Sequence, residues 1–126
     1  MLDTHVLLWW TLEPGRLSAT AAARLHEMER LGGFASSISI WELAVKIQRG
    51  KLELGIPIGE FVRRIGATGV RLLAVDSVTW LRSVELAWDH RDPADRVIVA
   101  TALLQNVPLV TADTEIHRFG GVECVW

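Results

Sequence analysis

Apolar positions recur along this chain at two different spacings. Between Ala21 and Leu31 they follow the three- and four-residue spacing of a helix, which begins after the N-cap Ser18 and ends at Gly32. Short runs rich in leucine and β-branched residues predict strands. The predicted helices span residues 6–10, 18–31, 40–49, 61–65, 77–88, 94–104 and 114–119, and the predicted strands span 34–38, 70–75, 107–110 and 122–126. This alternation predicts an α/β fold with a central parallel sheet flanked by helices.

The segment from Ala94 to Leu104 is apolar on nearly all sides. A helix of this kind is expected in the interior of a domain rather than on its surface. Pro93 suits its first position and Asn106 its end. No linker or charge block interrupts the chain, so one domain over residues 1–126 is expected.

Composition narrows the class of protein. Half of the 126 residues are hydrophobic and 22% are charged, which excludes a disordered chain. The single cysteine, Cys124, excludes an internal disulfide, and no apolar stretch has the length of a membrane span. No signal peptide is recognised before Asp3, so the cytoplasm is the expected compartment. The net charge of −2 neither indicates nor excludes a nucleic-acid partner.

Four acidic residues fall at junctions between predicted elements: Asp3, Glu42, Asp95 and Asp113. Ligands of open parallel sheets bind at the carboxyl ends of the strands, and all four side chains are expected at that edge. Carboxylates held close together repel one another, and their oxygens are preferred ligands of Mg²⁺ or Mn²⁺. The pattern therefore indicates metal-dependent hydrolysis of a phosphodiester.

The first two acids also have purely structural interpretations. Asp3 fits the N-cap of the helix that follows it. Ser39 and Glu42 fit a capping box, and Lys46 lies four residues further on as an ion-pair partner for Glu42. For Glu42 alone, this structural interpretation is favoured.

The other two acids are open to the same objection. Asp92 before Pro93 reads as an N-cap, Asp95 as an acid in the first helical turn, and Asp113 as a cap or turn residue. Four separate caps need not all fall at the ligand-binding edge of one sheet. Their joint placement, rather than any single residue, favours a functional site.

Four segments, in this order, resemble the PIN-domain family, and specifically the VapC toxins of bacterial toxin–antitoxin modules. The segments are residues 2–9 (LDTHVLLW), 37–44 (SISIWELA), 90–96 (HRDPADR) and 109–113 (LVTAD). The resemblance implies a Mg²⁺- or Mn²⁺-dependent endoribonuclease that cleaves RNA, is inhibited by a cognate antitoxin and forms a homodimer.

The resemblance also implies roles for individual residues. Asp3 and Asp95 would be the principal metal ligands, and Glu42 and Asp113 would complete the acidic site. Thr4 and Thr111 would support it by hydrogen bonds. Asp92 competes with Asp95 for one acidic role, and Asp95 is preferred because it precedes the apolar helix.

The chain departs from the family pattern at its beginning. Family members have a hydrophobic first strand before the first aspartate, whereas only Met1 and Leu2 precede Asp3 here. We therefore expect a shortened central strand and a frayed Asp3, unless the start has been misassigned.

The remaining polar and aromatic residues are given structural interpretations. Arg91 and Arg96 flank the predicted site and are candidates for phosphate contacts, although solvation at the surface is favoured. The four histidines show no zinc-ligand spacing and are interpreted as structural or exposed. The six tryptophans suggest base stacking, but packing in a core or an interface is favoured.

Two alternative functions remain. A receiver-like signalling domain has a similar fold and Mg²⁺ site, but it needs a lysine near the last strands, and the chain has only Lys46 and Lys51. A catalytically inactive protein-binding module would follow if Asp3 were disordered.

Overall fold

A parallel sheet whose two halves are joined by Leu2 alone lies at the centre of the computed structural model, which describes residues 1–126. Leu2 forms parallel bridges to Ala35 on one side and to Val110 on the other. Its amide donates to the Phe34 carbonyl at 2.8 Å, and the Val110 amide donates to the Met1 carbonyl at 2.9 Å. In the described residues, Leu2 is the one bridge residue of the central strand.

Four short strands complete the sheet: β1 (Gly33–Ser36), β2 (Val70–Leu73), β3 (Leu109–Val110) and β4 (Cys124–Val125). β1 pairs with β2 and β3 with β4, all in parallel, which gives the order β2-β1-Leu2-β3-β4. The predicted α/β class and parallel sheet are confirmed. β2, β3 and β4 are shorter than predicted, and β1 spans Gly33–Ser36 rather than residues 34–38. Val75 and Val107 were included in the predicted strands because they are apolar, but they pack against the core without pairing.

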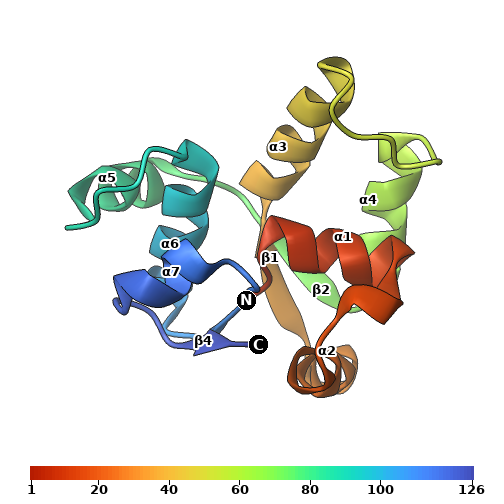
Figure 1. The fold of residues 1–126 in the computed structure, drawn as a ribbon, viewed down its shortest axis with the longest axis horizontal. Helices are drawn as coiled ribbons and strands as arrows, with labels where there is room; N and C mark the ends of the chain where they lie inside the picture. The colour runs from red at the N-terminus through yellow and green to blue at the C-terminus, as the bar shows by residue number, and fades with distance from the viewer.

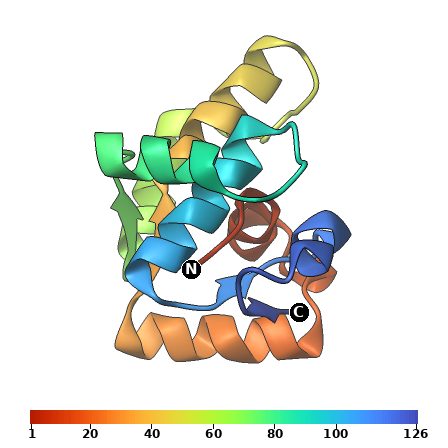
Figure 2. The ribbon, with the colours of Figure 1, turned by 90° about the vertical axis from the view of Figure 1, so that its left-hand side faces the viewer.

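Seven α-helices and one 3₁₀ helix surround the sheet: α1 (Thr4–Leu12), η1 (Pro14–Arg16), α2 (Ala19–Leu31), α3 (Ser37–Gln48), α4 (Ile58–Ala67), α5 (Ser77–Glu85), α6 (Pro93–Gln105) and α7 (Thr114–Phe119). Figure 1 shows α5, α6 and α7 on one side of the strands and α1 and α4 on the other. Figure 2, seen from the α5 and α6 side, shows α2 below the sheet and α3 above it. None of the helices combines the length and apolarity needed to cross a bilayer.

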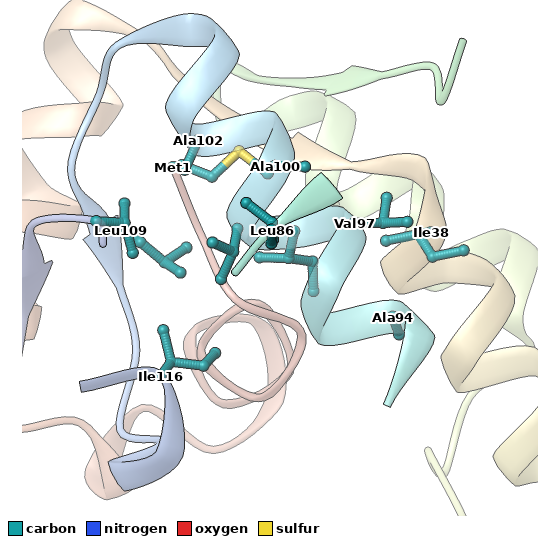
Figure 3. Close-up of a cluster of buried hydrophobic side chains, with 12 residues drawn as sticks. Met1, Ile38, Leu86, Ala94, Val97, Ala100, Ala102, Leu109 and Ile116 are labelled. Atoms are coloured by element: carbon teal, nitrogen blue, oxygen red, sulfur yellow. The ribbon is translucent and has the colours of Figure 1, made fainter. Parts of the chain in front are cut away.

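Helix α6 forms the centre of one of two hydrophobic cores. Val97 to Ala100 are fully buried, and Figure 3 shows α6 side chains facing Ile38 of α3, Leu109 of β3 and Ile116 of α7. The hydroxyl of Thr101, the polar residue in this run, donates to the Val97 carbonyl at 2.6 Å. The predicted burial of this helix is confirmed.

The second core lies on the opposite face of the sheet. Leu7 of α1, Leu25 of α2, and Phe61 and Ile65 of α4 are buried there, together with Leu2. Leu2 therefore contributes to packing as well as to pairing, and its side chain is fully buried.

The predicted boundaries of helices α3 and α5 are wrong. Ser36, not Ser39, is the N-cap of α3, and its hydroxyl accepts from the Ile38 amide at 3.4 Å. Asp76, not Ser77, caps α5, and the helix ends at Glu85 rather than at residue 88. In both places neighbouring polar residues offered competing caps, and the sequence pattern did not distinguish them.

The Arg96 side chain explains the early end of α5. Its guanidinium donates to five carbonyls at the end of the helix and in the following loop: those of Ser83, Val84, Leu86, Trp88 and His90. These bonds satisfy carbonyls that a helix end leaves without partners. The predicted surface solvation or phosphate contact of Arg96 is wrong, since the guanidinium is occupied within the protein.

We expect Leu2→Ala to lower the free energy of unfolding by about 3 kcal/mol, because it opens a cavity where the halves of the sheet meet. Urea denaturation measures this loss. Leu104→Ala is the matched control, because Leu104 is 43% exposed on α6 and its truncation should cost well under about 1 kcal/mol. Equal losses in the two variants would contradict the central role of Leu2.

Candidate functional site

Asp3 lies where the central strand becomes helix α1. Its amide donates to the Val110 carbonyl at 3.1 Å, and its side chain is 2% exposed. One carboxylate oxygen, Oδ1, accepts from the Thr4 amide at 2.6 Å, and Oδ2 accepts from the Thr111 hydroxyl at 2.8 Å. The N-cap interpretation of Asp3 is confirmed, and the expectation that this residue frays is wrong.

Glu42 reaches the same place from the second turn of α3. Its Oε2 accepts from the Thr4 hydroxyl at 2.7 Å, and its Oε1 accepts from Lys46 Nζ at 2.6 Å. Ser39 Oγ lies 3.0 Å from Thr4 Oγ1 and extends this network. The predicted ion pair with Lys46 is confirmed, but the capping box is wrong, since Ser39 lies inside the helix.

Asp95 approaches from the first turn of α6. Its side chain is 18% exposed, and its Oδ2 lies 2.7 Å from His90 Nε2. Asp92 remains exposed as the N-cap of α6, with Oδ1 accepting from the Ala94 amide at 2.8 Å. Of these two acids, Asp95 is the one that is half-buried and whose pKa the charge of Asp3 affects.

The acids affect one another's ionisation. Burial raises the pKa of Asp3, and the negative charge of Glu42 adds to this, while the Thr111 hydrogen bond lowers it. Burial is the largest cause that raises the pKa of Asp95 to about 7, with smaller contributions from the charges of Asp92 and Asp3, while the His90 hydrogen bond opposes the rise. We call Asp3, Glu42 and Asp95 the acidic site.

Asp113 stands apart from the acidic site. Its Oδ1 accepts from the amides of Glu115 at 2.7 Å and Ile116 at 3.4 Å, so the predicted N-cap of α7 is confirmed. Only its backbone is linked to the site, because the Asp113 amide donates to the Thr111 hydroxyl at 3.0 Å. The structure shows no hydrogen bond between its carboxylate and another acid.

His90 is the site residue that the sequence interpretation missed. Its ring stacks on Trp88 with centroids 4.1 Å apart and planes 5° apart, and Trp88 in turn stacks on Phe119 at 4.9 Å. The position of His90 is therefore fixed by two contacts: the stacking of its ring on Trp88 and the hydrogen bond to Asp95. The only sequence signal for it was its place in the segment 90–96, since the histidine lies in a loop without helical or strand periodicity.

The donor chemistry fits a hard divalent cation held by few protein ligands. No three His, Cys, Asp or Glu side chains form a ready ligand set. Mg²⁺, however, is commonly bound by one or two carboxylates and completes its shell with water and phosphate oxygens. Asp3 and Asp95 are the candidates for such a pair, because the charge of Asp3 acts on the pKa of Asp95, and Asp95 Oδ1 makes no hydrogen bond within the protein. A cation between them would favour the charged forms that burial disfavours.

Comparisons with known proteins point to one family and one fold. A family model described as PIN domain matches residues 1–122. The chain is 33% identical over 129 residues to Ribonuclease VapC22 from Mycobacterium tuberculosis, covering 100% of this chain and 97% of the relative. The crystal structure of VapBC2 from Rickettsia felis bound to a DNA fragment from their promoter matches with a TM-score of 0.69 at 16% identity, covering 98% of this chain and 95% of that one.

The chain belongs to the PIN-domain family. The resemblance to VapC proteins inferred from the four segments is confirmed by the relative, and the fold is confirmed by the solved structure. A receiver-like signalling domain is excluded by this membership.

We expect His90→Phe to weaken Mn²⁺ binding about tenfold, because it keeps a ring on Trp88 but removes the hydrogen bond that orients Asp95. His90→Gln retains an N–H donor and should recover part of the affinity. Electron paramagnetic resonance titration of free Mn²⁺ measures both, with thermal melting as the check on folding. His26→Phe, at an exposed position of α2, is the control. Unchanged Mn²⁺ affinity in His90→Phe would show that the histidine does not position Asp95.

Proposed function

We propose that this chain is a Mg²⁺- or Mn²⁺-dependent endoribonuclease and the toxin of a type II toxin–antitoxin module. The observation that carries the proposal is the buried Asp3 at the carboxyl edge of the sheet together with the half-buried Asp95, whose pKa the charge of Asp3 helps to raise. The similarity to a relative named as a ribonuclease supports RNA as the substrate class. A cytoplasmic location follows from this proposal.

In the proposed hydrolysis, some residues of the site would bind the cation and others position the binding residues. Asp3 and Asp95 would hold the cation, and a bound Mg²⁺ or Mn²⁺ supplies positive charge that activates water at neutral pH and stabilises charge developing on the phosphodiester. Thr111 holds Asp3 through Oδ2, and His90 holds Asp95 through Oδ2. Rigid carboxylates keep the reacting groups in a fixed geometry, which lowers the entropic part of the barrier.

Glu42 has a supporting role in this proposal. Both of its oxygens accept hydrogen bonds from the protein, one from Thr4 and one from Lys46. It contributes negative charge next to Asp3 and joins α3 to α1. Asp113 contributes through the backbone bond to Thr111 and remains a proposed member of the outer site.

The inactive protein-binding alternative depended on a disordered Asp3. The carboxylate is instead buried and accepts two hydrogen bonds, so the structural reason for expecting inactivity is gone.

We expect Asp95→Asn to lower RNA cleavage by at least about 100-fold, because the amide removes the charge that holds the cation. The assay follows cleavage of a mixed RNA substrate with Mn²⁺, with Mg²⁺ and with EDTA, and chelation should abolish the activity. Asp89→Asn is the matched control, since Asp89 lies exposed in the same loop. Cleavage that survives both Asp95→Asn and EDTA would overturn the proposal.

Helix α5 supports the proposal that the chain forms a homodimer. It turns Thr79 and Ser83 toward the interior and leaves Val78, Leu81 and Val84 exposed at 57%, 65% and 77%. An ordinary surface helix buries its apolar side chains and exposes its polar ones, whereas α5 does the opposite. Exposed apolar faces of this kind are typical of protein interfaces. A cognate antitoxin is the second proposed partner, and the solved VapBC2 neighbour supports it.

We expect the double variant Leu81→Glu/Val84→Glu to sediment as a monomer, because two carboxylates would be buried in the dimer without partners. Sedimentation velocity of the purified chain gives the mass. Arg82→Glu introduces an acid on the same helix and should leave the dimer intact. A dimer that persists in the double variant would place the interface elsewhere.

A further inference from the structure

A cleft of about 270 Å³ lies along the junction of α3 and α6 and reaches the acidic site at Glu42. Glu42 and Asp92 line its acidic part. The rest of its polar lining is cationic and comes from the last turn of α3 and the residues just after it: Lys46, Arg49 and Lys51. Three cations against two carboxylates give the polar lining a net charge of +1.

The three cationic side chains of the cleft differ in whether they form an ion pair within the protein. Lys46 is paired with Glu42 at 2.6 Å. Arg49 and Lys51 are exposed and form no ion pair or side-chain hydrogen bond. Many other exposed cations are paired with an acid on their own helix or turn, as are Arg24 with Glu27 and Arg118 with Glu115. The cleft therefore holds two positive charges that no protein group neutralises.

The backbone fixes where these two side chains begin. The Gly50 amide donates to the Ile47 carbonyl at 2.9 Å, and the Lys51 amide donates to the Lys46 carbonyl at 2.8 Å. This pair of bonds is a Schellman motif, and it requires the left-handed conformation that Gly50 adopts at φ 65°. Arg49 and Lys51 thus leave a rigid turn rather than a mobile loop.

We propose that Arg49 and Lys51 bind the phosphate backbone of single-stranded RNA and lead it to the acidic site. The inference rests on the proposed ribonuclease function. A strand whose scissile phosphate lies at Asp3 and Asp95 needs cations nearby to offset the repulsion between acidic site and substrate, and the cleft provides them. Trp41, 54% exposed on the cleft wall, offers an indole face on which a base stacks.

The test measures binding apart from cleavage. A fluorescent single-stranded RNA is titrated against the Asp95→Asn protein, which leaves the RNA intact, at several salt concentrations. Adding Arg49→Ala/Lys51→Ala should weaken binding about tenfold at low salt and reduce the slope of log K against log salt by about 1.4, because about 0.7 counterions are released per phosphate contact on single strands. Both side chains are exposed, so thermal melting should not change.

The control is Arg24→Ala/Arg30→Ala in the same background. It removes the same charge from α2, on the opposite edge of the sheet, and should leave the salt slope nearly unchanged. An affinity and slope equal to those of this control would overturn the inference. Cleavage that depends on Asp95 but not on Arg49 and Lys51 would refute the cleft alone, whereas cleavage independent of Asp95 would refute the proposed function.

Discussion

The pairing of Leu2 with strands on both sides is the constraint on which the rest of the structure depends. One residue connects the β1–β2 half of the sheet to the β3–β4 half, and it also fills the core beneath α1. The chain turns into a helix immediately afterwards, so the next residue, Asp3, is carried to the carboxyl edge with its backbone bonded to Val110. The position of the Asp3 carboxylate therefore follows from the pairing of Leu2, the residue directly before it.

Burying carboxylates at that edge has an electrostatic cost, and the surrounding residues offset only part of it. Thr111 stabilises the Asp3 carboxylate, Lys46 neutralises Glu42, and His90 bonds Asp95. Even so, the pKa of Asp95 remains raised to about 7. A cation bound beside these carboxylates would favour their charged forms, which burial disfavours. This is how the fold supports the proposed metal-dependent chemistry.

The sequence predicted features that depend on long, repeated patterns. The apolar run of α6, its stop at Asn106 in the left-handed conformation and the parallel alternation all reflect many residues that favour the same structure. The position of Asp3 at the end of the central strand and of Asp95 in the first turn of α6 also followed from the sequence pattern. The hydrogen bond of His90 to Asp95 and the bonds of Arg96 to the end of α5 could not be predicted from the sequence. Both depend on how the loop between α5 and α6 folds. The choice of Ser36 over Ser39 as the N-cap of α3 did not follow either, because both are serines, which are equally good N-caps by residue type.

The cationic cleft proposed for RNA and the α5 face proposed for a protein partner are linked by one apolar cavity. Trp41 borders the cationic cleft, and it also lines, with Trp80 of α5, a neighbouring apolar cavity of about 570 Å³. Trp80 belongs to the same helix as the exposed Leu81 and Val84, and Trp41 belongs to the cleft proposed for RNA. In the two proposals, the dimer face and the RNA cleft are therefore linked by one cavity that both tryptophans line.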